Sequence, residues 1–270
     1  MHHSNTISTP SHESKVSSIG VFMVSLGATL FFYEFFIRVI PSVIAEELRY
    51  EFSLTASMLG VISSSFYYAY TFMQIPSGLL CDRFGPKKLL TIGMICVGIS
   101  TFLFASSTTV SFVALSRFIC GATSAFAFIC PAVLAINWIP GRHFALVAGL
   151  IQAMGCLGAI IGSLPLSHLV DIYGWRIALI FSGLPGIIIG IFIILFLKDR
   201  PDHIQEQFES QEINLKSQWE GLKRVILRPQ NWLIGACGFC SWGPLAVFAE
   251  LWVKIIHVLI ECLIVCERFL

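Results

Sequence analysis

Charged side chains are scarce in this chain of 270 residues: Asp, Glu, Lys and Arg together make up 12% of it. Soluble domains carry about a quarter. Hydrophobic residues reach 56%, so the composition excludes a soluble globular domain and predicts an integral membrane protein. The net charge is only +1 and no basic stripe stands out, so binding to nucleic acid is not expected.

The sequence also lacks a disulfide framework and any motif that supports catalysis. Nine cysteines are an odd number, and five of them lie in or beside apolar stretches, where cysteine behaves as a small hydrophobe: Cys81, Cys96, Cys120, Cys130 and Cys156. Cys237 and Cys240 have the spacing of half a zinc site, but no second pair or nearby histidine completes it. Without a nucleophile beside a base, a phosphate-binding loop or a metal cluster, we expect neither an enzyme nor a cofactor.

What fills the chain instead is a series of long apolar runs separated by short polar turns. Six runs have the length of about 20 residues that a helix needs to cross a bilayer: residues 19–45, 54–80, 89–106, 110–139, 145–170 and 177–197. A seventh run follows at residues 232–252. The predicted fold class is therefore an all-α membrane protein, with a six-helix bundle and a seventh transmembrane helix.

The composition changes along the chain and predicts five segments. They are a polar tail (1–17), the six-helix bundle (18–198), a charged linker (199–230), the seventh helix (231–252) and an atypical C-terminal tail (253–270). The first segment lacks the basic start and small-residue cleavage pattern of a signal peptide. The last is apolar but is interrupted by Lys254, His257, Glu261 and Arg268.

Basic residues are distributed unevenly between alternate connections of the predicted spans. If the N-terminus is cytoplasmic, eleven Lys and Arg residues fall on the cytoplasmic side and only Arg49 and Arg176 on the other. Cytoplasmic loops of membrane proteins carry such an excess. We therefore expect a multi-pass protein of the bacterial inner membrane whose N-terminus lies in the cytoplasm.

One short connection, between the second and third spans, carries a dense motif. Its pattern is G-x-L-x-D-R-x-G-x-K, and it supplies Gly78, Asp82, Arg83, Gly85, Lys87 and Lys88. A glycine at position 78 lets a neighbouring helix approach closely, and one at position 85 permits a sharp reversal. This pattern resembles the loop between helices two and three of the major facilitator superfamily of secondary transporters, with Pro86 where that family usually has a basic residue.

The resemblance extends along residues 19–252 through further motifs: Arg117-x-x-x-Gly121, Asn137-Trp138-Ile139-Pro140, Gly174-Trp175-Arg176, Leu184-Pro185-Gly186 and Lys198-Asp199-Arg200-Pro201. It implies the N-terminal half-bundle of that fold, a small-molecule solute, and transport by alternating access. It also implies that the loop with Asp82 and Arg83 is a cytoplasmic gate. Arg38 with Tyr70 and Gln74 is most similar to the branch that transports organic anions such as sugar acids.

Three residues that are charged at neutral pH lie within the first six predicted spans, where charge is costly and therefore indicates function. Glu34 and Arg38 are one helical turn apart in the first span and can pair. Arg117 lies in the fourth span, and we expect it to face the same central cavity as Arg38. Both arginines are candidates for attracting an anionic solute, and Glu34 is a candidate proton carrier. The alternatives are that Arg38 extends to the outer interface and that Arg117 anchors helices through hydrogen bonds.

Polar side chains in the second span share one face. Tyr67, Tyr70 and Gln74 fall at i, i+3 and i+7, and the resemblance places Tyr70 and Gln74 at positions that line the solute site. An interhelical hydrogen-bonding face is the alternative. Two acidic residues expected from the organic-anion branch are absent, because Ile37 and Ser124 occupy their positions. Glu34 substitutes for them, or transport is not driven by protons.

Small residues in the fifth span form a face that predicts close helix packing rather than antiport: Gly155, Gly158 and Gly162. The antiporter motif needs a proline after its central glycine, and none stands there.

The family has two six-helix halves, and the sequence carries one half with a seventh helix. The resemblance stops at Trp252, and we expect the tail after it to reflect a frameshift and a truncated product. Three functions stay open: a secondary transporter of a small organic solute, a non-transporting remnant, and a membrane module or half-transporter that acts as a dimer. Besides the lipid bilayer, the expected partners are the solute, a coupling proton or cation, and either a missing C-terminal half or a second copy.

Overall fold

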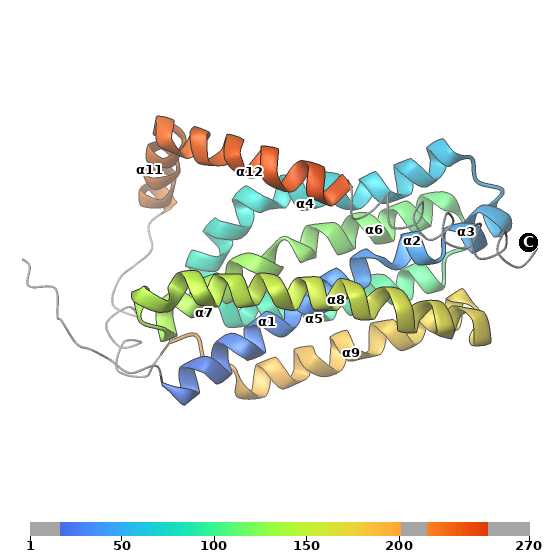
Figure 1. The fold of residues 1–270 in the computed structure, drawn as a ribbon, viewed down its shortest axis with the longest axis horizontal. Coiled ribbons are helices and arrows are strands. Elements are labelled where there is room, and N and C mark those ends of the chain that lie inside the picture. Colours follow the sequence, from blue (N-terminus) through green and yellow to red (C-terminus); the bar gives the residue numbers. More distant parts are fainter. Residues whose placement is uncertain (1–16, 201–214, 248–270) are drawn as a thin grey trace, which may run out of the picture.

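A computed structural model describes residues 17–200 and 215–247, and all regular secondary structure in these ranges is helical (Figure 1). The bundle consists of α1 (Ser18–Arg38), α2 (Ile40–Val43), α3 (Ala45–Phe52), α4 (Ala56–Phe84), α5 (Pro86–Ala105), α6 (Val110–Ser124), α7 (Phe126–Trp138), η1 (Gly141–His143), α8 (Phe144–Tyr173) and α9 (Trp175–Phe196). Helices α11 (Leu215–Ile226) and α12 (Pro229–Val247) follow. Residues 1–16 of the predicted polar tail (1–17), residues 201–214 of the predicted linker (199–230) and the predicted C-terminal tail (253–270) lie outside the described residues.

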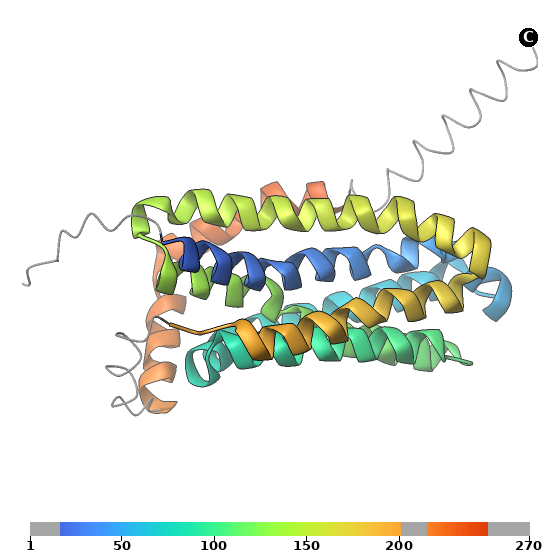
Figure 2. The ribbon, with the colours of Figure 1, turned by 90° about the horizontal axis from the view of Figure 1, so that it is seen from below.

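The long helices run beside one another along the longest axis of the bundle (Figures 1 and 2). The most extensive packing joins α5 to α9, α4 to α6, and α1 to α8. In order of predicted spans, these pairs are three with six, two with four, and one with five. If spans one, two and three are exchanged with spans four, five and six, the pair of spans two and four becomes the pair five and one. The pair of spans three and six is unchanged by this exchange. The packing thus has the symmetry of a repeated three-helix unit, as the resemblance implies.

Two glycines support the same repeat, because each forms the turn between the second and third helices of one unit. Gly85 has φ 80° and ψ 155°, and Gly174 has φ 80° and ψ 157°. Positive φ of this kind is disfavoured for residues that carry a Cβ. The reversal predicted at Gly85 is confirmed, and the equivalent turn at Gly174 is identical in form.

Glycines also set the distance between packed helices. A Cβ built at Gly158 would collide with the backbone carbonyl of Phe32 on α1, and one built at Gly162 would collide with α1 one turn further along. Gly121 of α6 packs in the same way on the carbonyl of Phe66 of α4. The close packing predicted for the glycine face of the fifth span is therefore confirmed, and its partner is the first span.

Five segments of the described chain are long and apolar enough to cross a membrane: Ser18–Val43, Pro86–Ala105, Val110–Trp138, Gly141–Tyr173 and Trp175–Phe196. They correspond to the predicted first, third, fourth, fifth and sixth spans. The predicted second span, now α4, is not among them because serines, tyrosines and Gln74 lower its hydropathy. The predicted seventh span is not among them either. Its described part, α12, ends at Val247, and residues 248–252 lie outside the described structure.

The two ends of the bundle differ in charge. One end gathers the start of α1, the turn from α4 to α5 and the ends of α7 and α9, with the basic residues Arg83, Lys87, Lys88, Arg142, Lys198 and Arg200. At the other end, where α3 lies (Figure 1), the start of α9 reaches α3, and these two segments contain Arg49 and Arg176. This segregation is the one that the predicted alternation of spans requires.

A polar cluster closes the less basic end. Arg176 donates through Nη1 to the carbonyls of Ala105 (2.7 Å) and Ser107 (2.9 Å) and pairs through Nη2 with Glu51 of α3. The indole of Trp175 donates to the other Glu51 oxygen at 2.7 Å. Partial burial raises the pKa of Glu51, but the hydrogen bonds from Arg176 and Trp175 outweigh it, so the pKa lies below its ordinary value near 4.5. From the sequence, Arg176 stood out in the charge count and, with Trp175, in a family motif, but no pattern singled out Glu51 as their partner.

We expect Gly158→Val to lower the thermal stability of the purified chain, because the added side chain meets the Phe32 carbonyl. Overpacking of this kind costs about 1–3 kcal/mol. The matched control is Gly149→Val on the same helix, since a Cβ there has no neighbour within 4 Å among the described residues. Thermal unfolding in detergent measures both variants. Equal stability of the two would contradict the packing of α8 on α1.

Acid should remove the contribution of Glu51 to stability. Its pKa is lowered in the folded chain, so the stabilisation is present above the ordinary pKa and is lost as pH falls through the folded value. We expect Glu51→Gln to have a lower unfolding temperature at pH 7 and a flatter profile between pH 6 and pH 3.5. Glu46→Gln on the same short helix, with an exposed carboxylate, should keep the wild-type profile. If the unfolding temperature of Glu51→Gln falls with pH as steeply as that of wild type, the Glu51 carboxylate is not the source of the acid sensitivity.

Candidate functional site

An ion pair lies inside the bundle at the end of α1. The Nη2 atom of Arg38 is 2.6 Å from Oε1 of Glu34, and its Nε donates to the same oxygen at 2.8 Å. The Glu34 side chain is fully buried, and 12% of the Arg38 side chain is exposed. The pairing predicted from the spacing of one turn is confirmed. It brings a carboxylate and a guanidinium together where either alone would be costly.

Aromatic rings surround the Arg38 guanidinium. Its central carbon lies 4.5 Å from the ring centroid of Phe35, 5.2 Å from Tyr70, 5.3 Å from Phe66 and 5.9 Å from Tyr67. Each ring attracts a cation through its quadrupole. Three of the four rings belong to α4, so this helix holds the arginine of α1 in place. We call these four rings with Arg38 and Glu34 the arginine cage.

The predicted polar face of α4 is assembled at the edge of the arginine cage. The Tyr70 side chain interacts with both Arg38 and Gln74, and its ring stacks on Phe66 at 5.9 Å between centroids. Tyr67, Tyr70 and Gln74 are each half-buried. Phe66 itself is fully buried, and sequence reasoning did not select it because an apolar residue in a span gives no signal of function.

Arg117 makes the kind of contact that the alternative considered from the sequence predicts, a hydrogen bond that anchors one helix to another. Its side chain is only 3% exposed, and its guanidinium is 4.8 Å from the Phe66 ring centroid. Its Nη1 atom donates to the backbone carbonyl of Ile37 at 3.4 Å. A narrow gap beside it is lined by Ser100, Thr101, Ser116, Cys120 and neighbouring apolar residues. The structure thus brings both arginines to Phe66 but does not show them side by side on one open cavity.

The gate motif forms the turn at the basic end of the bundle. Asp199, from the segment after α9, accepts a hydrogen bond from the backbone N–H of Lys87 in the first turn of α5. A carboxylate at this place satisfies a free helix amide and complements the helix dipole. Burial raises the pKa of Asp199, and the Lys87 N–H and the nearby basic residues act against that rise. A Cβ at Gly85 would lie 2.7 Å from the Asp199 carboxylate, so glycine is required there for space as well as for its backbone conformation.

The other motif residues stand apart from this contact. Asp82 lies close enough to Arg200 for their charges to interact, and the Arg83 guanidinium is 5.3 Å from the Phe84 ring. Lys88 contributes charge near Asp199. At Gly78 the prediction of a close helix approach is not met within the described chain, because no atom lies within 4 Å of a Cβ built there. Among the described residues, no helix packs closely on Gly78.

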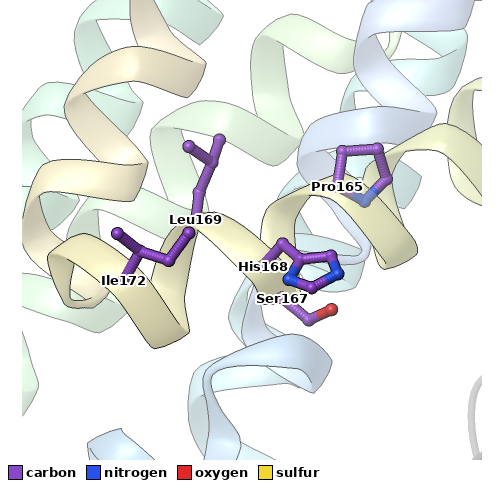
Figure 3. A pocket seen from close by; sticks show the side chains of 5 residues that line it. All are labelled: Pro165, Ser167, His168, Leu169 and Ile172. Atoms are coloured by element: carbon purple, nitrogen blue, oxygen red, sulfur yellow. The ribbon is translucent and has the colours of Figure 1, made fainter.

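One shallow surface pocket lies far along α8, toward its C-terminal end (Figure 3). Its lining residues all come from this helix: Pro165, Ser167, His168, Leu169 and Ile172. A hollow formed by a single helix does not enclose a ligand, and it contains none of the predicted site residues. The arginine cage therefore remains the candidate site.

Comparisons with known proteins identify the fold. Residues 18–260 match the family model of the Major Facilitator Superfamily. The chain is 30% identical over 233 residues to the probable sulfoacetate transporter SauU of Cupriavidus necator, which covers 81% of this chain and 53% of that protein. It is 28% identical over 235 residues to the membrane sensor protein UhpC of Escherichia coli, with coverage of 78% and 51%.

A solved structure has the same arrangement of helices. It is a bacterial homolog of the human lysosomal transporter Spinster in an inward-facing, unoccupied conformation, with a TM-score of 0.63 and 17% identity over 69% of this chain and 45% of that one. The chain spans about half the length of these relatives. With a matching family model, apolar spanning helices and this likeness in fold, the chain belongs to the major facilitator superfamily and is an integral, multi-pass membrane protein.

Proposed function

We propose that this chain provides the N-terminal half-bundle of a secondary transporter for a small organic anion, with Arg38 as the main contact of the anionic group. The observation that carries the proposal is the arginine cage. A guanidinium inside a membrane bundle is held by one carboxylate and four rings beside the polar face of α4. Intramembrane charge of this kind marks solute or ion pathways.

The proposed binding step is an exchange of acceptors on Arg38. Carboxylate and sulfonate oxygens match the planar fork of a guanidinium, so an anionic solute competes with Glu34. Tyr70 and Gln74 then offer hydrogen-bonding groups at the edge of the cage, and Tyr67 borders it. Sulfoacetate, named for the relative SauU, carries both kinds of anionic group, which supports an organic anion as substrate class.

Glu34 is the proposed site of proton coupling. While ionised, it occupies Arg38, and once protonated it no longer competes with an anion for the guanidinium. Ile37 and Ser124 have no carboxylate that could bind and release a proton. The Glu34 carboxylate, which contacts Arg38, is therefore the candidate proton carrier. Anion binding would thereby be linked to uptake of a proton from the same side of the membrane.

Orientation and gating complete the proposal. The basic end of the bundle faces the cytoplasm of a bacterial inner membrane, with the N-terminus on that side. There the motif with Gly78, Asp82, Arg83, Gly85, Lys87 and Lys88 acts as a gate. Its Gly78 packs against a helix of a second bundle, supplied by further chain or by a second copy. Alternating access then arises from rocking of the two bundles about the arginine cage.

A sensor is the second candidate function, favoured by the likeness to the membrane sensor protein UhpC. A sensor needs the same anion-binding cage but no net movement of solute. Binding to the purified chain tests the site that both functions share. Uptake into proteoliposomes separates them, because a sensor binds the anion without accumulating it.

We expect Arg38→Ala to abolish measurable binding of sulfoacetate to the purified chain in isothermal titration calorimetry. Arg38→Lys keeps the charge but lacks the planar fork, and loss of a charge-assisted hydrogen bond predicts binding about tenfold weaker. Arg49→Ala, with its exposed side chain, is the control and should bind like wild type. Folded Arg38→Ala with unchanged affinity would remove Arg38 from the site.

The Glu34→Gln variant tests the competition directly. We expect it to bind sulfoacetate severalfold more tightly than wild type at pH 7, because the amide no longer neutralises Arg38. Glu46→Gln, which removes an exposed carboxylate outside the arginine cage, should bind like wild type. A Glu34→Gln chain with wild-type affinity would contradict the proposed competition.

A further inference from the structure

We propose that Arg117 is a positioning residue, which supplies the hydrogen-bond donor that Pro41 withholds from helix one and thereby fixes Arg38. In this role it holds the backbone at the break between α1 and α2 and need not touch the solute. The effect on solute affinity rests on the proposed function of Arg38. The structural part of the inference stands independently of it.

The break occurs where a proline removes a donor. Helix α1 ends at Arg38 and α2 begins at Ile40, with Pro41 in its first turn. In a continuous helix, the N–H of residue 41 would donate to the carbonyl of Ile37, and proline has no N–H. The Val39 N–H turns toward the Ile37 carbonyl at the helix cap, which leaves the second lone pair of that oxygen for another donor.

Arg117 reaches this carbonyl from another helix. Its Nη1 atom donates to the Ile37 oxygen at 3.4 Å, and its Nε has no hydrogen-bond partner among the described residues. Burial of a guanidinium with so few acceptors is costly. We therefore infer that the hydrogen bond to the Ile37 carbonyl, which lacks its usual N–H donor because residue 41 is proline, is the reason that Arg117 is buried here. Gly121, one turn later on α6, packs on the Phe66 carbonyl and so sets Arg117 at the height of the break.

The same contact lies next to the arginine cage. Ile37 immediately precedes Arg38, so the orientation of its carbonyl is coupled to the direction of the Arg38 side chain. Phe66 connects the two arginines, with its ring 4.8 Å from the Arg117 guanidinium and 5.3 Å from that of Arg38. If Arg117 is lost, both the break and the ring are free to shift, and Arg38 moves away from Glu34 and Tyr70.

A double-mutant cycle with Pro41 tests the inference. Arg117→Met removes the donor at similar side-chain length, and Pro41→Ala restores a backbone N–H for the Ile37 carbonyl. Two measurements report on Arg38: the side-chain Nε–H signal in nitrogen-15 NMR, and calorimetric affinity for sulfoacetate. We expect Arg117→Met alone to shift the Arg38 signal and to weaken binding about tenfold, and Arg117→Lys, which keeps a donor, to do so less.

In the Pro41→Ala background, Arg117→Met should change affinity by less than about twofold and leave the Arg38 signal nearly in place. Equal effects in both backgrounds, or an Arg38 signal unmoved by Arg117→Met, would overturn the proposal. If Arg117→Met does not fold, recovery of folded protein by Pro41→Ala supports it and failure to recover contradicts it. If wild type does not bind sulfoacetate, the function proposed with that probe fails, while the NMR cycle still decides the role of Arg117.

Discussion

The hydrocarbon core of a membrane offers no water to a free backbone amide or carbonyl, so each must find its partner within the protein. Helices satisfy this constraint along their length but not at their ends and breaks. In this bundle, side chains from distant segments form hydrogen bonds with backbone groups at helix ends and breaks. Asp199 accepts from the first turn of α5, Arg176 donates to the carbonyls of Ala105 and Ser107, and Arg117 donates to Ile37. Asp199, Arg176 and Arg117 thus each pair with backbone groups that the helices leave without an internal partner.

Close packing of backbones follows from the same environment. Since lipid is as apolar as the side chains, helices associate through tight contact and polar links rather than through hydrophobic burial. Gly158 on Phe32 and Gly121 on Phe66 provide such contacts, and they align α8 with α1 and α6 with α4. This alignment places α4 aromatics around Arg38. The arginine cage, formed by residues of α1 and α4, therefore depends on packing that also involves α6 and α8.

Much of the fold could be predicted from the chain alone. Apolar runs located most helices to within a few residues, and the spacing of Glu34 and Arg38 predicted their ion pair. The run at 54–80 shows where hydropathy alone fails to identify a membrane span, because the serines, tyrosines and Gln74 of α4 lower its mean hydropathy. The contact between Glu51 and Arg176 spans 125 positions, and no local pattern could indicate it. Phe66 was missed because its role depends on two arginines from other helices.

By itself, the sequence determined the membrane environment, the helical class, the turns at Gly85 and Gly174 and the ion pair within one helix. These features depend on local backbone conformation, on composition, or on neighbours one turn apart. Only the tertiary structure decided that Arg117 turns to a backbone carbonyl while Arg38 is enclosed by rings. The reason is that the partners of a buried charge come from whichever helices pack beside it, and that packing is set by backbone contacts between segments far apart in the chain.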